Sequence, residues 1–109
     1  MSALLITIAR LRPDGGAALE RYAAGVIPLI AAAGGQVIVR GMPRETVVGD
    51  NDHGDRPDLV ALMRFPSGDA IRTFLESREY LSHRPFRDAA FDELRSYIAD
   101  DLGEIASSS

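Results

Sequence analysis

Residues 34–41, Gly-Gly-Gln-Val-Ile-Val-Arg-Gly, join the end of a helix to a short strand. A glycine pair commonly ends a helix, because glycine adopts the left-handed backbone conformation without a steric penalty. The β-branched run after it is typical of a strand, which we expect over 36–40. The following Gly-Met-Pro should bend the chain, and residues 45–48 could resume the strand. This stretch therefore predicts a change from helix to strand at residue 35.

A strand and a helix are predicted before this stretch. Residues 3–12 alternate in polarity and stop at a Pro-Asp-Gly-Gly turn cluster, which indicates a strand. Apolar side chains from Leu19 to Ile30 then recur at helical spacing and form one amphipathic stripe. We expect the side chain of Asp14 to cap this helix.

Downstream, the pattern predicts a loop, a strand and further helix. Residues 49–58 are the most polar stretch and should form a loop. The third strand is expected over 59–65, followed by a second helix with Ser67 as its cap. A further helical segment should run from Ser77 towards Ala90. Residues 91–102 fit helical spacing slightly better than a closing edge strand, and both alternatives stay open.

The order β-α-β-β-α, with a possible last strand, predicts the ferredoxin-like fold of the α+β class. This fold has an antiparallel sheet with helices on one face and leaves the other face bare. A second copy is the simplest cover for that face, so we expect a homodimer that forms a dimeric α+β barrel. We expect one domain over residues 1–102 and a C-terminal tail over 103–109.

Composition excludes several classes of site. The 109 residues include no Cys, which excludes disulfides, thiolate nucleophiles and cysteine metal sites. All 12 basic residues are Arg, so Schiff-base and P-loop lysines are excluded as well. A net charge of −4 gives no basic footprint for nucleic acid or anionic membranes. The apolar N-terminal run is too short to span a bilayer, and we expect a cytoplasmic protein.

Four segments together resemble one known family. They are Gly-Gly-Gln-Val-Ile-Val-Arg-Gly at 34–41, Leu-Val-Ala-Leu-Met-Arg-Phe-Pro-Ser at 59–67, Ser-Arg-Glu-Tyr at 77–80 and Pro-Phe-Arg-Asp-Ala-Ala at 85–90. In this order they are similar to the family catalogued as domain of unknown function 1330, over about residues 3–100. The resemblance implies the dimeric α+β barrel and a fourth strand at the C-terminal end.

The resemblance implies no particular reaction. The wider superfamily includes cofactor-free monooxygenases, lactone isomerases, polyketide cyclases and haem enzymes, so the fold alone does not choose a chemistry. Two residues depart from the family pattern. Met42 stands where a second glycine is common, and Arg64 stands where members often carry an acidic residue.

The first candidate site lies in the segment after the second predicted helix. Tyr80, His83, Arg84 and Arg87 share one stripe at helical spacing, although Pro85 interrupts the segment. Imidazole titrates near neutrality, so His83 could exchange a proton with substrate alongside Tyr80 as the catalytic pair. Arg87 would then bind a carboxylate or enolate oxygen. The structural alternative is that Tyr80 packs in the core and Arg87 holds a carbonyl or an acidic neighbour.

The second candidate site pairs two strand arginines. Counting by twos places Arg40 on the same face as Ile38, and Arg64 on the same face as Leu62. If both arginines point away from the helices, they enter the cavity on the dimer side and bind an anionic substrate. The alternative is an ion pair with an acidic side chain across the dimer.

Two other residues are candidates for substrate binding. Tyr22 lies on the apolar helical stripe, where its hydroxyl could reach the edge of a pocket. His53 lies in the polar loop, where ligand lids often occur. The acidic residues of that loop do not fit calcium-loop spacing, and we expect no metal. Motifs of serine hydrolases, zinc proteases and dinucleotide folds are absent from the sequence.

These observations favour a small enzyme without a cofactor that transfers protons on a small anionic or carbonyl-bearing molecule. Isomerase, cyclase and lyase reactions suit the residue types present. One alternative is a non-catalytic dimer that binds a small molecule or acts as an accessory. Another is a cofactor-free monooxygenase of the antibiotic-biosynthesis type, and a haem enzyme has the least support.

Overall fold

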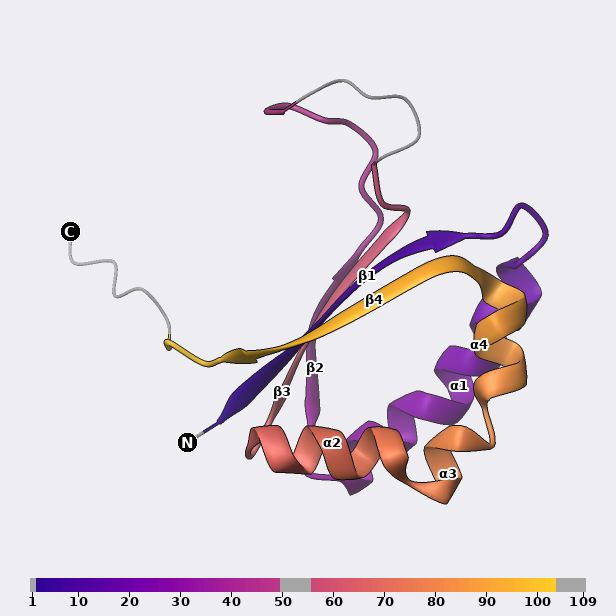
Figure 1. Cartoon of the computed structure of the whole chain (residues 1–109). Coiled ribbons are helices and arrows are strands. Elements are labelled where there is room, and N and C mark those ends of the chain that lie inside the picture. Colours follow the sequence, from indigo (N-terminus) through magenta and orange to yellow (C-terminus); the bar gives the residue numbers. More distant parts are fainter. Residues whose placement is uncertain (1, 50–55, 104–109) are drawn as a thin grey trace.

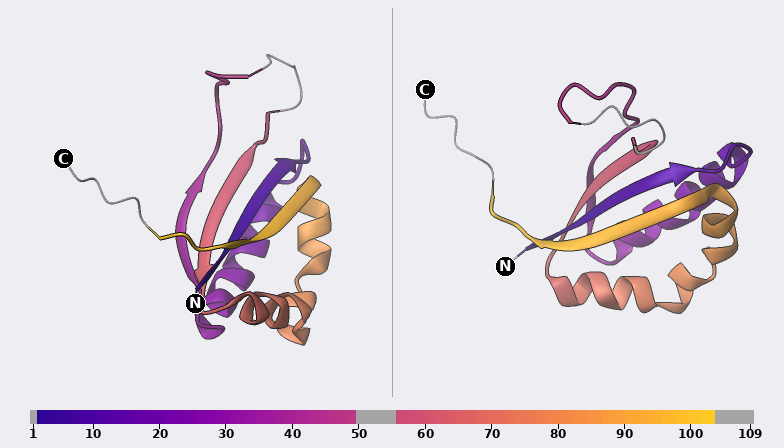
Figure 2. Two further views of the ribbon diagram at one scale, coloured as in Figure 1. Left: turned by 60° about the vertical axis from the view of Figure 1, so that its left-hand side comes forward. Right: turned by 45° about the horizontal axis from the view of Figure 1, so that its top comes forward.

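The computed structural model describes residues 2–49 and 56–103. An antiparallel sheet with strand order β2-β3-β1-β4 forms one layer, and the helices lie together on one of its faces (Figures 1 and 2). The strands are β1 (Ala3–Leu11), β2 (Gln36–Gly41), β3 (Leu59–Phe65) and β4 (Phe91–Asp100). The helices are α1 (Gly16–Ala32), α2 (Gly68–Glu76), α3 (Arg78–Leu81) and α4 (Arg84–Ala90). The expected ferredoxin-like α+β arrangement is confirmed.

The last segment is a strand, although its spacing slightly favoured a helix. β4 pairs with β1 from Ala3 opposite Asp100 to Leu11 opposite Phe91, with a register shift between Arg10 and Leu11. Leu94 pairs with Ala9 on the face that carries the helices. The shift therefore places Phe91 and Leu94 on one face although they are three residues apart, which imitates helical spacing.

Two predicted helix ends are confirmed. Gly34 has φ +83°, and the N–H groups of Gly34 and Gly35 donate to carbonyls in the last turn of α1, at 3.0 and 2.8 Å. This is the glycine-dependent helix stop that the sequence indicated. At the start of α2, the backbone N–H of Ala70 donates to Oγ of Ser67 at 3.0 Å, as expected of the cap.

Two local predictions are wrong. Gly15 occupies the cap position of α1, and no side chain caps that helix, so Asp14 does not have the expected role. The turn is positioned by packing instead, because a β-carbon on Gly15 would lie 2.5 Å from the carbonyl oxygen of Ala90. Residues 45–48 do not resume the β2 strand, which ends at Gly41.

The hydrophobic core fills the space between the sheet and the helices. Phe65 of β3 and Ile71 of α2 are its most deeply buried large side chains. Burial of each such side chain contributes roughly 1.5–3 kcal/mol to folding. The buried core residues are Ala3, Leu5, Val26, Ile30, Met63, Phe65, Ile71, Phe74 and Tyr80. This core fixes the helices over the sheet and thereby positions the candidate site.

The opposite face of the sheet carries an apolar surface that no helix covers. The ladder aligns Ile6 with Leu62 and Ile8 with Val60, and alternation along the strands puts these side chains on the face away from the helices. Ile8 is 37% exposed and Tyr97 of β4 is 49% exposed. This open face is the surface on which the expected homodimer would form.

Two expectations concern parts of the chain outside the described residues. His53 lies there, as does the expected tail after Gly103. Within residues 2–49 and 56–103, no helix has the length and apolar character needed to cross a bilayer.

Candidate functional site

Two adjacent spaces that share part of their lining lie on the helix side of the sheet. The inner cavity measures about 90 Å³ and has mostly apolar walls from α1 and from all four strands. The outer pocket measures about 440 Å³ and has polar walls that include Arg87, Asp88 and Asp92. Five residues line both spaces: Leu75, Tyr80, Phe91, Leu94 and Ser96. An apolar cavity with a few converging polar groups is the usual form of a small-molecule site.

A hydrogen-bonded cluster stands where the two spaces meet. The hydroxyls of Tyr22 on α1 and Tyr80 on α3 lie 2.8 Å apart. Nη1 of Arg87 on α4 donates to the Tyr80 hydroxyl oxygen at 3.3 Å, and the guanidinium carbon lies 5.9 Å from the centre of the Tyr80 ring. The three candidate residues Tyr22, Tyr80 and Arg87 therefore form one cluster, built from three separate helices.

The surroundings raise the pKa values of Tyr22 and Arg87. Burial raises the pKa of Tyr22 above its ordinary value, and the neighbouring Tyr80 raises it further, while Arg87 lowers it only in part. Burial alone would lower the pKa of Arg87, but the hydrogen bond to Tyr80 and the nearby Asp88 reverse the effect and raise it. Tyr22 therefore stays a neutral phenol and Arg87 a cation over the physiological pH range.

His83 is not part of this cluster. α3 ends at Leu81 and α4 begins at Arg84, so the expected helical stripe is broken by a turn at His83. The imidazole packs against Gly25 of α1, and its Nδ1 atom is buried without a hydrogen-bond partner. His83 lines neither space because its ring packs against α1, and the catalytic pairing of His83 with Tyr80 stays a prediction.

Arg40 and Arg64 lie on opposite faces of the sheet, so the expected pair does not exist. The β2–β3 ladder shifts register between Val37 and Val39. After this shift Arg40 pairs with Ala61, which lines the inner cavity on the helix side, and Arg40 lines the cavity as well. Arg64 pairs with Leu4 of β1 on the open face. Side chains no longer alternate regularly between the two faces of the sheet across an irregularity of this kind, so the face predicted for Arg40 was wrong.

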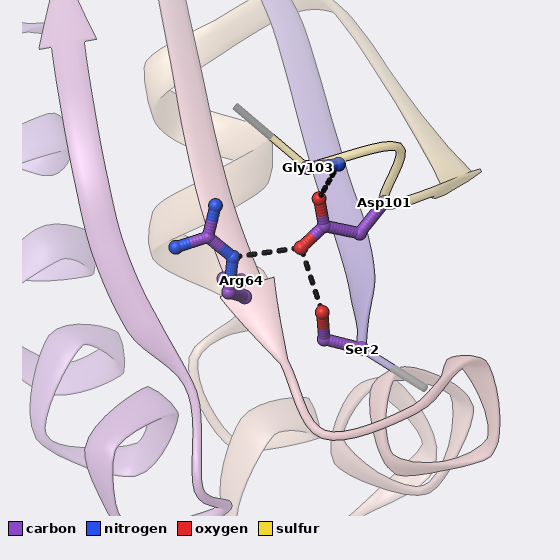
Figure 3. Close-up of polar contacts among 4 residues, drawn as sticks. All are labelled: Ser2, Arg64, Asp101 and Gly103. Atoms are coloured by element: carbon purple, nitrogen blue, oxygen red, sulfur yellow. Dashed lines mark hydrogen bonds and ion pairs between the residues drawn. The ribbon is translucent and has the colours of Figure 1, made fainter. Parts of the chain in front are cut away.

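Arg64 is held by a carboxylate of its own chain (Figure 3). Its Nε donates to Oδ2 of Asp101 at 2.8 Å, and the Ser2 hydroxyl donates to the same oxygen at 2.6 Å. The backbone N–H of Gly103 donates to Oδ1 at 2.8 Å. These bonds, first that of Ser2, lower the pKa of Asp101 to about 2. Arg64 thus belongs to a clasp at one end of the sheet, which joins the residues next to the start of β1 and the end of β4, and it does not line either space.

Sequence reasoning did not select the hydroxyl pair on the cavity floor. Oγ1 of Thr7 and Oγ of Ser96 lie 3.0 Å apart and are cross-strand neighbours on the helix side. The sequence contained a weak indication that Thr7 belongs to a site, because Thr7 is a polar residue at a core-facing position of an apolar strand. It contained no such indication for Ser96, since the segment that holds Ser96 fitted both a helix and a strand.

Solved structures share this fold. A protein of unknown function from Rhodopseudomonas palustris superposes with a TM-score of 0.79 at 22% identity, over 94% of this chain and 84% of that one. A dimeric protein of unknown function with a ferredoxin-like fold from Bacteroides fragilis gives 0.67 at 11% identity, over 92% and 96%. SnoaB, a cofactor-independent oxygenase from Streptomyces nogalater, gives 0.65 at 14% identity, over 96% and 97%.

No curated protein is similar in sequence to this chain. A family model does match, and it covers residues 6–100. Its match spans all four strands from Ile6 of β1 to the end of β4, together with the helices that form the site. The chain belongs to the family described as domain of unknown function (DUF1330).

Proposed function

We propose that the chain is a homodimeric enzyme, independent of any cofactor, that transfers protons on a small carbonyl-bearing molecule. The observation that carries the proposal is the hydrogen-bonded cluster of Tyr22, Tyr80 and Arg87 at the junction of the two spaces. The substrate would place its apolar part in the inner cavity and its carbonyl oxygen on this cluster. The reaction would be an isomerisation, a cyclisation or a lyase step that passes through an enolate.

The cluster suits the stabilisation of an enolate oxygen. Arg87 donates to the Tyr80 oxygen, and with Tyr22 as a second donor the Tyr80 proton is left to bind the substrate oxygen. Donors fixed in a partly dry site stabilise developing negative charge strongly. The proton on carbon needs a base, and the carboxylates of Asp88 and Asp92 in the outer pocket supply candidates in place of His83.

The homodimer is supported by the open apolar face of the sheet and by a relative. The exposed side chains of Ile8 and Tyr97 would lose water in a face-to-face dimer. The Bacteroides fragilis protein of this fold is described as dimeric. The cofactor-independent oxygenase SnoaB shows that the fold carries enzymes without a bound cofactor.

Proton transfer is tested by deuterium exchange. The protein is incubated in D₂O with small ketones, oxo acids and lactones, and proton NMR follows the loss of the C–H signal beside the carbonyl. Tyr80→Phe should lower the exchange rate by about 100-fold or more, the usual effect of removing one oxyanion donor. Arg72→Gln is the control, because Arg72 is exposed on α2 and pairs with Asp69, away from both spaces. Equal exchange by wild type and Tyr80→Phe would overturn the proposal.

One observation favours a second candidate, a binding protein without catalysis. His83 packs against Gly25, so among the residues that the structure describes no imidazole lines either space to exchange protons near neutrality. A binding protein would retain carbonyl compounds without exchanging their protons. Tyr80→Phe would then weaken binding, and no deuterium would enter the ligand at any pH.

The oxygenase alternative is supported by the fold shared with SnoaB and with an antibiotic biosynthesis monooxygenase-like protein from Nitrosomonas europaea. Cofactor-free oxygenation needs an electron-rich aromatic substrate, and the inner cavity of about 90 Å³ is small for a ring. An apolar cavity of about 150 Å³ is known to hold benzene. Oxygen uptake with a phenolic substrate would revive this alternative, and no uptake would remove it.

A further inference from the structure

Four residues form one row across the helix side of the sheet. The ladders align Arg40 of β2 with Ala61 of β3, Ala61 with Thr7 of β1, and Thr7 with Ser96 of β4. All four line the inner cavity. We infer that this row, Arg40–Ala61–Thr7–Ser96, anchors the carboxylate of the substrate, which would be a ring-free aliphatic oxo acid. The inference rests on the proposed function and names its substrate class.

The register shift in β2 brings Arg40 into the row. Before the shift Gln36 pairs with Arg64 on the open face, and after it Arg40 pairs with Ala61 on the helix side. A regular ladder would leave Arg40 on the same face as Gln36, four residues earlier. Such irregularities often redirect a side chain next to a functional site. Ala61 beside it is small, which leaves space in front of the guanidinium.

The polar groups of the row are available to an anion. Arg12, Arg64, Arg72 and Arg87 have carboxylate partners, whereas Arg40 takes part in no ion pair among residues 2–49 and 56–103. A guanidinium binds a carboxylate through two parallel hydrogen bonds. The bond between Thr7 and Ser96 uses one of their two hydroxyl protons, so the other can be donated to a ligand.

The dimensions of the cavity define the class of molecule. About 90 Å³ holds a short aliphatic chain but not a ring, since an apolar cavity that takes benzene is about 150 Å³. Three strand spacings, about 14 Å, separate the backbones at the two ends of the row. Arg40 stands at the β2 end, and Tyr80 stands where the outer pocket begins beside β4. The carboxylate and the carbonyl would therefore lie at opposite ends of the bound molecule, with at least two carbons between them.

The experiment measures binding directly. 4-Oxopentanoate is titrated into the intact protein by calorimetry, and its methyl ester and 4-acetylbenzoate, whose ring lies between the carboxylate and the carbonyl, are titrated for comparison. Arg40→Gln should weaken binding of 4-oxopentanoate at least tenfold, and Thr7→Val, which removes only the hydroxyl, should weaken it less. The ester should bind weakly to wild type and be insensitive to Arg40→Gln. Arg72→Gln should leave every affinity unchanged, because Arg72 pairs with Asp69 on the exposed side of α2.

The outcomes separate this inference from the proposed function. The inference is overturned if wild type does not bind 4-oxopentanoate, if Arg40→Gln binds it equally well, or if 4-acetylbenzoate, whose ring would have to enter the inner cavity, binds as tightly. Deuterium exchange that depends on Tyr80 but not on Arg40 would overturn the anchor and leave the proposed function intact. Binding that depends on Arg40, with no exchange on any carbonyl compound, would support the anchor and remove the proposed enzyme.

Discussion

The imidazole of His83 packs against the backbone of Gly25, where a β-carbon would lie 2.5 Å from Nδ1. The contact joins α1 to the turn between α3 and α4, whose neighbouring residues Tyr80 and Arg87 belong to the candidate site. Glycine in the middle of a helix is unfavourable on its own. Its presence at position 25 is explained by the ring that occupies the space of a side chain.

Gly25→Ala should destabilise the protein by about 1–3 kcal/mol, the usual effect of adding volume to a packed interface. The gain in helix propensity, about 0.5–1 kcal/mol, offsets only part of this. Urea unfolding measures the difference. In the background of His83→Ala the same substitution should be neutral or stabilising, because the ring is gone. A stabilising effect of Gly25→Ala alone would show that His83 does not occupy this space.

His83→Ala should keep the deuterium exchange activity, in contrast to Tyr80→Phe. The ring packs against Gly25, and Nδ1 is buried without a partner, so the imidazole does not reach the substrate oxygen at Tyr80. Exchange rates of the two variants, measured at equal folded concentration, check this. Loss of exchange in His83→Ala with the fold intact would restore the role that the sequence suggested.

Asp101→Asn should lower the melting temperature at neutral pH but not in strong acid. The native pKa of about 2 lies below the ordinary 3.8, so the ionised carboxylate favours the folded state above pH 3.8. That stabilisation is lost as the pH falls from 3.8 towards 2. Melting curves of wild type and Asp101→Asn should therefore converge over this interval. Asp14→Asn, in an exposed turn, is the control. A difference that stays constant with pH would contradict the clasp in Figure 3.

Ile8→Glu should convert the proposed homodimer to a monomer. Ile8 lies on the open face of the central strand β1, and a carboxylate there would be buried without a partner in a face-to-face dimer. Leu81→Glu is the matched control, because Leu81 on α3 is 40% exposed against 37% for Ile8. Sedimentation equilibrium measures both. A dimer that survives Ile8→Glu, or a wild type that is monomeric, would place the interface elsewhere or remove it.

Most of the fold could be predicted from local signals. The glycine at 34 and the cap at Ser67 mark helix ends through backbone chemistry that acts within a few residues. The strands before and after α1 could be predicted from the alternating polarity of residues 3–12 and from the β-branched residues of 36–40. The capping role predicted for Asp14 was wrong, because the start of α1 is set by packing of Gly15 against Ala90, which lies far away in sequence.

The errors at the site have a common physical origin in irregular backbone. The register shift in β2 places Arg40 on the helix side of the sheet. The regular alternation of side chains along a strand had predicted the open face. A second register shift, beside Phe91 of β4, produced helical spacing in a strand. The turn at His83 broke a stripe that a continuous helix would have kept. A single added residue changes the parity of a strand, and no local pattern in the sequence marks where it occurs.

A crystal structure of the protein with 4-oxopentanoate would show whether a carbonyl oxygen binds at the cluster of Tyr22, Tyr80 and Arg87. We expect the ligand between the sheet and α1, its oxo oxygen within hydrogen-bond distance of the Tyr80 hydroxyl and its carboxylate on Arg40. A ligand bound on the open face of the sheet, or a cavity that stays closed to it at saturating concentration, would contradict the account.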